Sequence, residues 1–233
     1  MSSLPNPIVG ADAQLRQSSI ISQVYAWMTA GLLVTGAVAA STVNSPMLLN
    51  LIFGNPFAIW ILFIAEIGMV IGLGAAINRL SPGVATALFL AYSTVTGLTL
   101  SSIFLVYTSA SIASTFFITG GMFGAMSLYG YVTQRDLTRL GNLLVMALLG
   151  FFLASIANFF LQSAALYWIV TYAGILIFVG LIASDTQKIK RLAQQATNET
   201  SARRIAILGS LMLYLDFINL FLLLLRLFGS RRD

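Results

Sequence analysis

The chain has 233 residues, of which 58% are hydrophobic and only 8% charged, and its mean hydropathy is +0.92. A soluble domain has roughly a quarter of its residues charged, so this chain cannot cover a water-facing surface. The sequence contains no cysteine and no histidine. Disulfides, thiolate and histidine catalysis and the common zinc sites are therefore excluded. These properties predict an all-α polytopic membrane protein.

The formal net charge is +5, but the charged residues are bunched. None occurs between Arg16 and Glu66, between Arg79 and Arg135, or after Arg139 before Asp185. Positive charge confined to the ends of apolar runs orients helices in a membrane. We therefore expect a lipid bilayer and no nucleic acid as the partner of these charges.

Seven apolar runs follow one another, each near the length of about 20 residues that crosses a bilayer. In chain order they are 20–40, 56–77, 84–107, 112–132, 142–161, 166–185 and 205–228. Residues 1–19 are predicted to be a polar cytoplasmic tail, uncleaved because they lack the pattern of a signal peptide. Residues 20–229 form the transmembrane domain, and 230–233 a short C-terminal tail.

The connections alternate in charge, which predicts the orientation of the chain. The connections after the first, third and fifth runs carry no lysine or arginine, whereas those on the opposite side carry all of these: Arg16, Arg79, Arg135, Arg139, Lys188, Lys190, Arg191, Arg203 and Arg204. By the positive-inside rule the N-terminus is cytoplasmic. Seven full spans then place the C-terminus outside; a last helix that re-enters without crossing is the alternative. The short outer turns predict three antiparallel helix pairs followed by an unpaired seventh helix.

Two glycine pairs at GxxxG spacing, Gly68 with Gly72 and Gly120 with Gly124, are expected to mark close helix contacts.

Three acidic residues lie in or at the apolar runs: Glu66, Asp185 and Asp216. The segment 197–202, TNETSA, is the polar turn between the last two runs, and DTQKIKRLAQQA before it continues the sixth helix into the cytoplasm. Asp185 and Asp216 are equally far from this turn, each about 20 Å at 1.5 Å per residue. We therefore expect the two side chains to face each other inside the membrane.

Two carboxyl groups at close quarters in a low-dielectric environment share one proton and titrate as a unit. Arg79, at the inner end of the second run, is placed to reach the pair and stabilise its ionised form. Asn219, one turn beyond Asp216, is expected to supply a hydrogen bond. Glu66 is a possible second polar point along a pathway.

Other interpretations of these residues remain open. Asp185 can be a solvated residue near a helix end, and Arg79 a snorkelling anchor. Asp216 lies in mid-span, where an ionisable residue usually serves a pathway or a switch, although a purely structural hydrogen bond is an alternative. Arg226 and the two arginines of the tail are expected to mark the outer interface.

Three motifs resemble the Bax inhibitor-1 family, also called the transmembrane Bax inhibitor motif family. They are YLDFINLFLLLLRLFG at 214–229, TGLTLSSIFLVY at 96–107 and VGLIASDTQKIK at 179–190. The chain is most similar to the bacterial inner-membrane branch. The resemblance implies six helices, as three pairs, around a central C-terminal seventh.

The resemblance also implies a pH-sensitive calcium leak controlled by two aspartates, which match Asp185 and Asp216. A latch arginine of the family matches Arg79, and Glu66 resembles an acidic position near the pore. Suppression of cell death, associated with animal relatives, is supported by no residue here.

The sequence thus predicts a calcium leak channel of the bacterial inner membrane, gated by protons, with Asp185 and Asp216 as transient calcium ligands. No catalytic residue and no cofactor is expected, so the protein is predicted not to be an enzyme. One alternative is an interaction protein that modulates membrane proteases or stress responses, with unknown partners. A remote alternative is an intramembrane aspartyl protease, but the GxGD motif of such enzymes is missing before both aspartates.

Overall fold

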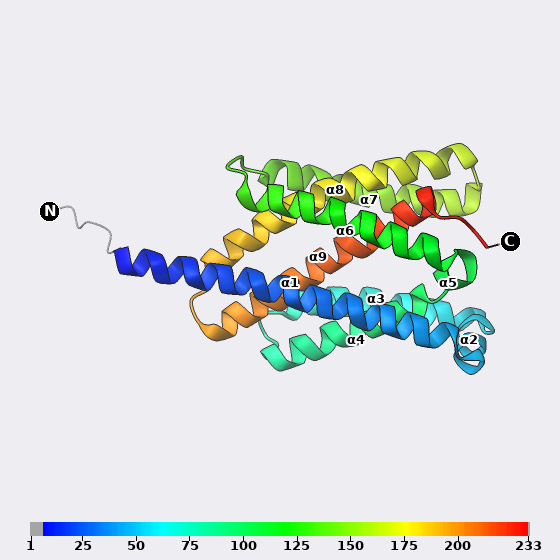
Figure 1. The fold of residues 1–233 in the computed structure, drawn as a ribbon, viewed down its shortest axis with the longest axis horizontal. Coiled ribbons are helices and arrows are strands. Elements are labelled where there is room, and N and C mark those ends of the chain that lie inside the picture. Colours follow the sequence, from blue (N-terminus) through cyan, green and yellow to red (C-terminus); the bar gives the residue numbers. More distant parts are fainter. Residues whose placement is uncertain (1–6, 233) are drawn as a thin grey trace. The chain divides into compact units, whose positions relative to one another are not determined.

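The computed structural model describes residues 7–232, and this part of the chain forms nine helices joined by short connections (Figure 1). They are α1 (Pro7–Val43), α2 (Pro46–Phe53), α3 (Pro56–Ala76), α4 (Pro82–Leu100), α5 (Ile103–Val106), α6 (Ser109–Val132), α7 (Thr138–Leu161), α8 (Ala164–Gln194) and α9 (Glu199–Phe228). Within this range seven helical segments are long and apolar enough to cross a membrane, α4 and α5 together counting as one. The predicted all-α class with seven spans is confirmed.

The helix boundaries differ from the apolar runs in several places. The predicted turn 197–202 is shorter than expected, because α9 begins at Glu199. The first helix begins at Pro7, well inside the segment expected to be a tail, and a short helix, α2, occupies the first connection. The third run breaks at Ser101 and Ser102, so that α5 follows α4 as a separate turn of helix. The sixth helix continues to Gln194, as predicted from its polar extension. Hydropathy marks the apolar part of a helix and not its polar ends, which explains the longer first and sixth helices but neither α2 nor the break before α5.

Three helices begin with the same arrangement, a capping side chain followed by a proline. Pro46, Pro56 and Pro82 each lie in the first turn, where a missing N–H leaves no helical hydrogen bond unmade. The residues before them, Ser45, Asn55 and Ser81, accept a hydrogen bond from a backbone N–H of that turn. These caps fix where each helix starts.

The chain divides into two compact units, residues 1–101 with 189–211 and residues 102–188 with 212–233. In the first unit α1 packs against α4. The Thr35 hydroxyl donates to the Ser93 carbonyl oxygen at 2.9 Å. A Cβ at Gly31 would lie 2.6 Å from Phe89 Cζ, so glycine is what permits this close approach.

In the second unit α7 and α8 form an antiparallel pair joined by a two-residue turn. The two helices approach closely at three glycines: Gly141 near Ser184, Gly180 near Leu144 and Gly174 near Phe151. The residue numbers in these pairs rise along α7 as they fall along α8, so the helices are antiparallel. The turn is closed by Gln162 in the left-handed conformation, with φ 49°. This is one of the helix pairs predicted from the short outer turns.

The expected glycine contacts are wrong in detail. A Cβ built on Gly68, Gly72, Gly120 or Gly124 meets nothing within 4 Å. The close contact on α6 is made by Gly130, where a Cβ would collide with the Ala183 backbone. GxxxG spacing alone does not say which face of a helix meets protein and which meets lipid.

The last helix is the most buried of the spans. In the most apolar stretch of α9, 72% of the residues are buried, whereas the share is 6% in the corresponding stretch of α3 and 0% in that of α7. It runs without a break for 30 residues, about 45 Å at 1.5 Å per residue. A re-entrant last segment would need a break in the helix, so the full span is the form that the structure supports. The burial is that expected of a central C-terminal helix.

Candidate functional site: a buried carboxyl pair in the second unit

Asp216 lies in the middle of α9 within the leucine-rich run that makes this helix a span. Its side chain is 4% exposed. Among the described residues no group forms a hydrogen bond with its Oδ2 atom, which is fully buried. A buried polar atom without a partner costs about 1–3 kcal/mol, and more if it is charged.

Asp185 lies on α8, in the same unit, and is half-buried. The two carboxyl groups are close enough to interact electrostatically. Lys188, one turn further along α8, is a cation that acts on Asp185. The structure thus brings together the two aspartates that the sequence singled out, although the turn lies between Gln194 and Glu199 and Asp185 is nearer to it than Asp216.

The part of α8 around Asp185 is held on both sides by polar contacts. The hydroxyl oxygens of Thr186 and Ser127 lie 3.3 Å apart, which joins α8 to α6. The Gln187 side chain accepts from the Leu137 N–H at 2.9 Å and donates to the Arg135 carbonyl oxygen at 2.8 Å. These residues position the backbone that carries Asp185.

Sequence reasoning did not identify Thr186 and Gln187. The available signal was their polarity: both follow Asp185 directly in an otherwise apolar helix, and both are buried. Buried polar groups need partners, so two consecutive polar residues at this place predict contacts with neighbouring elements.

The residue after Asp216 packs α9 against α6. The ring of Phe217 makes edge-on contacts with Phe123, at 5.6 Å between centroids, and with Phe116, at 5.2 Å. Both partners lie on α6. These contacts show that this part of α9 is closely packed.

The expected contact of Asn219 with Asp216 is not what the structure shows. The Asn219 amide nitrogen donates to the Leu215 carbonyl oxygen, one turn back on its own helix, at 2.8 Å. Helical spacing places a side chain on a face, but a carbonyl four residues back on the same helix can satisfy an amide locally.

The other two predicted site residues belong to the first unit. Glu66 on α3 accepts a hydrogen bond of 2.8 Å from the Thr99 hydroxyl of α4. Arg79 is exposed in the turn after α3. The roles of Arg79 as a latch and of Glu66 as a second polar point stay predictions.

A metal cannot be held here by a large cluster of acids. Among the described residues no group of three or more Asp or Glu side chains comes together. Calcium takes 6–8 oxygen ligands, and two carboxyl groups supply only part of that number.

Arg226, near the C-terminal end of α9, lies over an aromatic ring. The Arg226 guanidinium lies 4.7 Å from the centroid of the Tyr167 ring, and Trp168 stacks on Tyr172 nearby in sequence. Aromatic belts with basic residues are typical of the membrane interface. This agrees with the interface position expected for Arg226.

Seven apolar helices and a pair of neighbouring acids on the last two of them define the class: a multi-pass helical membrane protein with ionisable residues inside its spans. A family model described as "Inhibitor of apoptosis-promoting Bax1" matches residues 17–233. The chain therefore belongs to the Bax inhibitor-1 family, as its last-helix motif predicted.

Curated relatives cover almost the whole chain. It is 59% identical over 214 residues to the inner membrane protein YbhL of Escherichia coli strain K12, an alignment that covers 91% of this chain and 92% of the relative. It is 42% identical over 220 residues to an uncharacterized protein of Borreliella burgdorferi, covering 94% and 95%. A protein of Caulobacter vibrioides is 37% identical over 235 residues, covering 97% and 93%.

Proposed function

We propose that this protein is a pH-sensitive cation leak channel of the bacterial inner membrane, with calcium as the permeant ion. The observation that carries the proposal is Asp216: a buried carboxyl group in mid-membrane, with an oxygen that lacks a partner, beside a second acid. Intramembrane acids are costly and usually mark an ion path or a proton relay. Asp185 and Asp216 are the pH sensor and gate.

The chemistry of the pair accounts for both ion preference and pH sensitivity. Ionised carboxylates are the hard oxygen ligands that calcium prefers. Loss or gain of the shared proton changes the charge between α8 and α9 and so favours one of two packings of the last helix. In this proposal Arg79 is a latch that pairs with the acids in one state, and Glu66 is a further polar point of the pathway.

The inner-membrane location is supported by the name of the Escherichia coli relative and by the apolar helices. The proposed orientation, with a cytoplasmic N-terminus and a periplasmic C-terminus, rests on the positive charges of alternate connections. The function requires no catalytic residue and no cofactor, so we propose that the protein is not an enzyme.

The test is calcium flux into proteoliposomes that hold a calcium dye, measured from pH 5 to 9. Asp216→Asn and Asp185→Asn each keep the size of the side chain and remove the titrating group. We expect both to alter the flux and to abolish most of its pH dependence. Asp136→Asn is the matched control, because Asp136 is exposed in the connection before α7, where an amide oxygen can still accept from Thr138.

A wild-type flux that does not change across this pH range would reject the gating. Absence of flux in wild type, together with a protein partner that still co-purifies with the double aspartate variant, would favour the regulatory alternative. Cleavage of a reporter helix that is lost in Asp185→Ala would favour the protease.

A further inference from the structure

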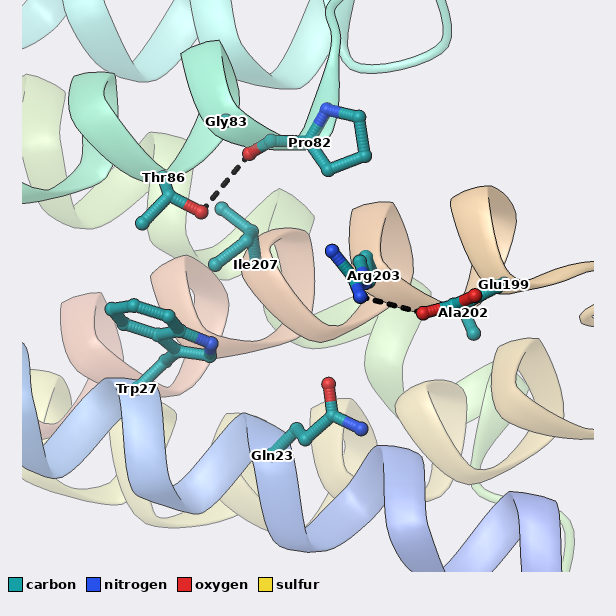
Figure 2. A pocket seen from close by; sticks show the side chains of 9 residues that line it. All are labelled: Gln23, Trp27, Pro82, Gly83, Thr86, Glu199, Ala202, Arg203 and Ile207. Atoms are coloured by element: carbon teal, nitrogen blue, oxygen red, sulfur yellow. Dashed lines mark hydrogen bonds and ion pairs between the residues drawn. The ribbon is translucent and has the colours of Figure 1, made fainter.

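A cavity of about 380 Å³ lies in the first unit between α1, α4 and the start of α9 (Figure 2). Its polar or aromatic lining residues are Gln23, Trp27, Thr86, Glu199 and Arg203. The volume falls in the range of roughly 300–1,000 Å³ typical of small-molecule sites. None of these residues belongs to the carboxyl pair or to the proposed cation path.

The cavity lies where spanning helices end. The fourth helix begins at Pro82 and α9 at Glu199, and both residues line the cavity. Trp27 adds an amphipathic ring, the side chain most typical of the level of lipid headgroups. This is also the end at which the basic connections lie, with Arg203 and Arg204 in the first turns of α9. The occupants available at this depth are the headgroups of membrane lipids.

The cavity offers two opposite charges side by side. Arg203 and Glu199 form an ion pair one turn apart on α9, with 61% and 79% of their side chains exposed. A pair so exposed contributes little to stability, and both groups are accessible to a ligand. Figure 2 shows the Trp27 indole nitrogen and the Gln23 amide turned toward the same space as the Arg203 guanidinium.

We propose that this cavity binds the headgroup of a phospholipid that carries a phosphate and a primary ammonium, the phosphoethanolamine type. The Arg203 guanidinium matches the phosphate, which takes two parallel hydrogen bonds from such a group. The start of α4 adds the positive end of a helix dipole. The Glu199 carboxylate accepts hydrogen bonds from the ammonium, and the Trp27 ring offers a cation–π contact.

The charged side chains that line the cavity also disfavour the headgroups of other lipids. An anionic headgroup such as phosphoglycerol brings no cation to Glu199, only neutral hydroxyl groups that donate weaker hydrogen bonds than an ammonium. A quaternary ammonium, as in phosphocholine, has no N–H with which to reach the carboxylate. The proposed order of affinity is therefore ethanolamine first, with glycerol and choline headgroups weaker.

The experiment uses the fluorescence of Trp27 in a chain whose other two tryptophans are replaced, Trp60→Phe and Trp168→Phe. Short-chain phosphatidylethanolamine, phosphatidylglycerol and phosphatidylcholine are titrated separately into the detergent-solubilised protein, and free O-phosphoethanolamine is a fourth arm. We expect saturable binding of the ethanolamine lipid, with a Kd at least about tenfold lower than that of the other three ligands.

Two variants test the assigned contacts. Arg203→Gln is expected to raise the Kd for the ethanolamine lipid about tenfold, and Glu199→Gln to remove the preference for ethanolamine over glycerol headgroups. Arg139→Gln is the control, an equal charge change on an exposed arginine of α7, and should leave both quantities unchanged. An unchanged melting temperature shows that each variant is folded.

Equal or tighter binding of phosphatidylglycerol, or a Kd that Arg203→Gln does not alter, would overturn the proposal. Free O-phosphoethanolamine binding as tightly as the lipid would overturn the assignment to a membrane lipid. The outcome is independent of calcium flux, because no residue is shared with the carboxyl pair.

Discussion

Single atoms decide whether helices in this protein can approach each other. At Gly130 a Cβ would collide with the Ala183 backbone of α8, and at Gly141 with the Ser184 hydroxyl. Glycine is what allows α6 and α7 to reach the part of α8 that carries Asp185. The same residue type at Gly124 faces open space, so the role of a glycine follows from its neighbours.

Gly130→Ala is predicted to destabilise the protein by about 1–3 kcal/mol, because the added methyl meets rigid backbone and the helices must separate. The measurement is the melting temperature in detergent. Gly124→Ala is the matched control on the same helix, and it should be neutral or slightly stabilising because alanine is the better helix former. Equal melting temperatures of the two variants would contradict the packing at Gly130.

A second prediction at this scale concerns Gln187. Gln187→Met keeps the length of the side chain but leaves the Leu137 N–H and the Arg135 carbonyl oxygen without this partner. A buried group left unsatisfied costs about 1–3 kcal/mol. We expect a lower melting temperature and faster amide exchange at Leu137 by hydrogen–deuterium exchange. Exchange at the wild-type rate would show that Gln187 does not hold this connection.

Some of the contacts that join the helices cannot be predicted from hydropathy. The C-terminal tail is an example: Tyr107 and Arg231 form an antiparallel bridge. The Thr108 N–H donates to the Ser230 carbonyl oxygen, and the Arg232 N–H donates to that of Val106 at 2.9 Å. The sequence predicted only a short tail after α9, but residues 230–232 fasten the end of α9 to α5 and the start of α6.

Removal of residues 230–233 is predicted to loosen this end of the second unit. The amides of Thr108 and of α5 should exchange faster with deuterium, and those in the middle of α9 should not change. Ser230→Ala with Arg232→Ala is a milder comparison that retains the backbone bonds and removes the contact of the Arg232 side chain with the Phe104 carbonyl oxygen. Equal exchange in the truncated and full chains would reject the fastening role.

Across the whole molecule, the spanning helices differ in how much of each is buried. The last helix is buried for most of its length, whereas α3 and α7 expose their apolar side chains. In water such exposure would cause aggregation, but in a bilayer these surfaces face lipid tails. The pattern is therefore evidence of a membrane environment that is independent of the composition.

The orientation of the chain can be tested directly because the sequence has no cysteine. Ala165→Cys lies at the start of α8 and Gln134→Cys in the connection before α7, and both positions are exposed. If the N-terminus is cytoplasmic, a maleimide that cannot cross membranes should label the first in spheroplasts and the second only after lysis. The opposite pattern would invert the predicted topology.

The sequence alone determined the class and the number of spans. Length, hydropathy and the position of charges are local properties of a chain in a bilayer, and a span needs no tertiary contact to be recognised. Counting residues from a turn at 197–202 predicted that Asp185 and Asp216 lie close together, and the two acids do interact. The reason was wrong, because the turn lies between Gln194 and Glu199 and Asp185 is nearer to it than Asp216.

Tertiary structure decided the remainder. Asn219 bonds its own helix, the GxxxG glycines face open space, and Thr186 and Gln187 tie α8 to its neighbours. These outcomes depend on which face of a helix meets another helix and which meets lipid. In a chain that is apolar almost all round, the periodicity of hydrophobic residues carries little information about that choice, so only the packed structure supplies it.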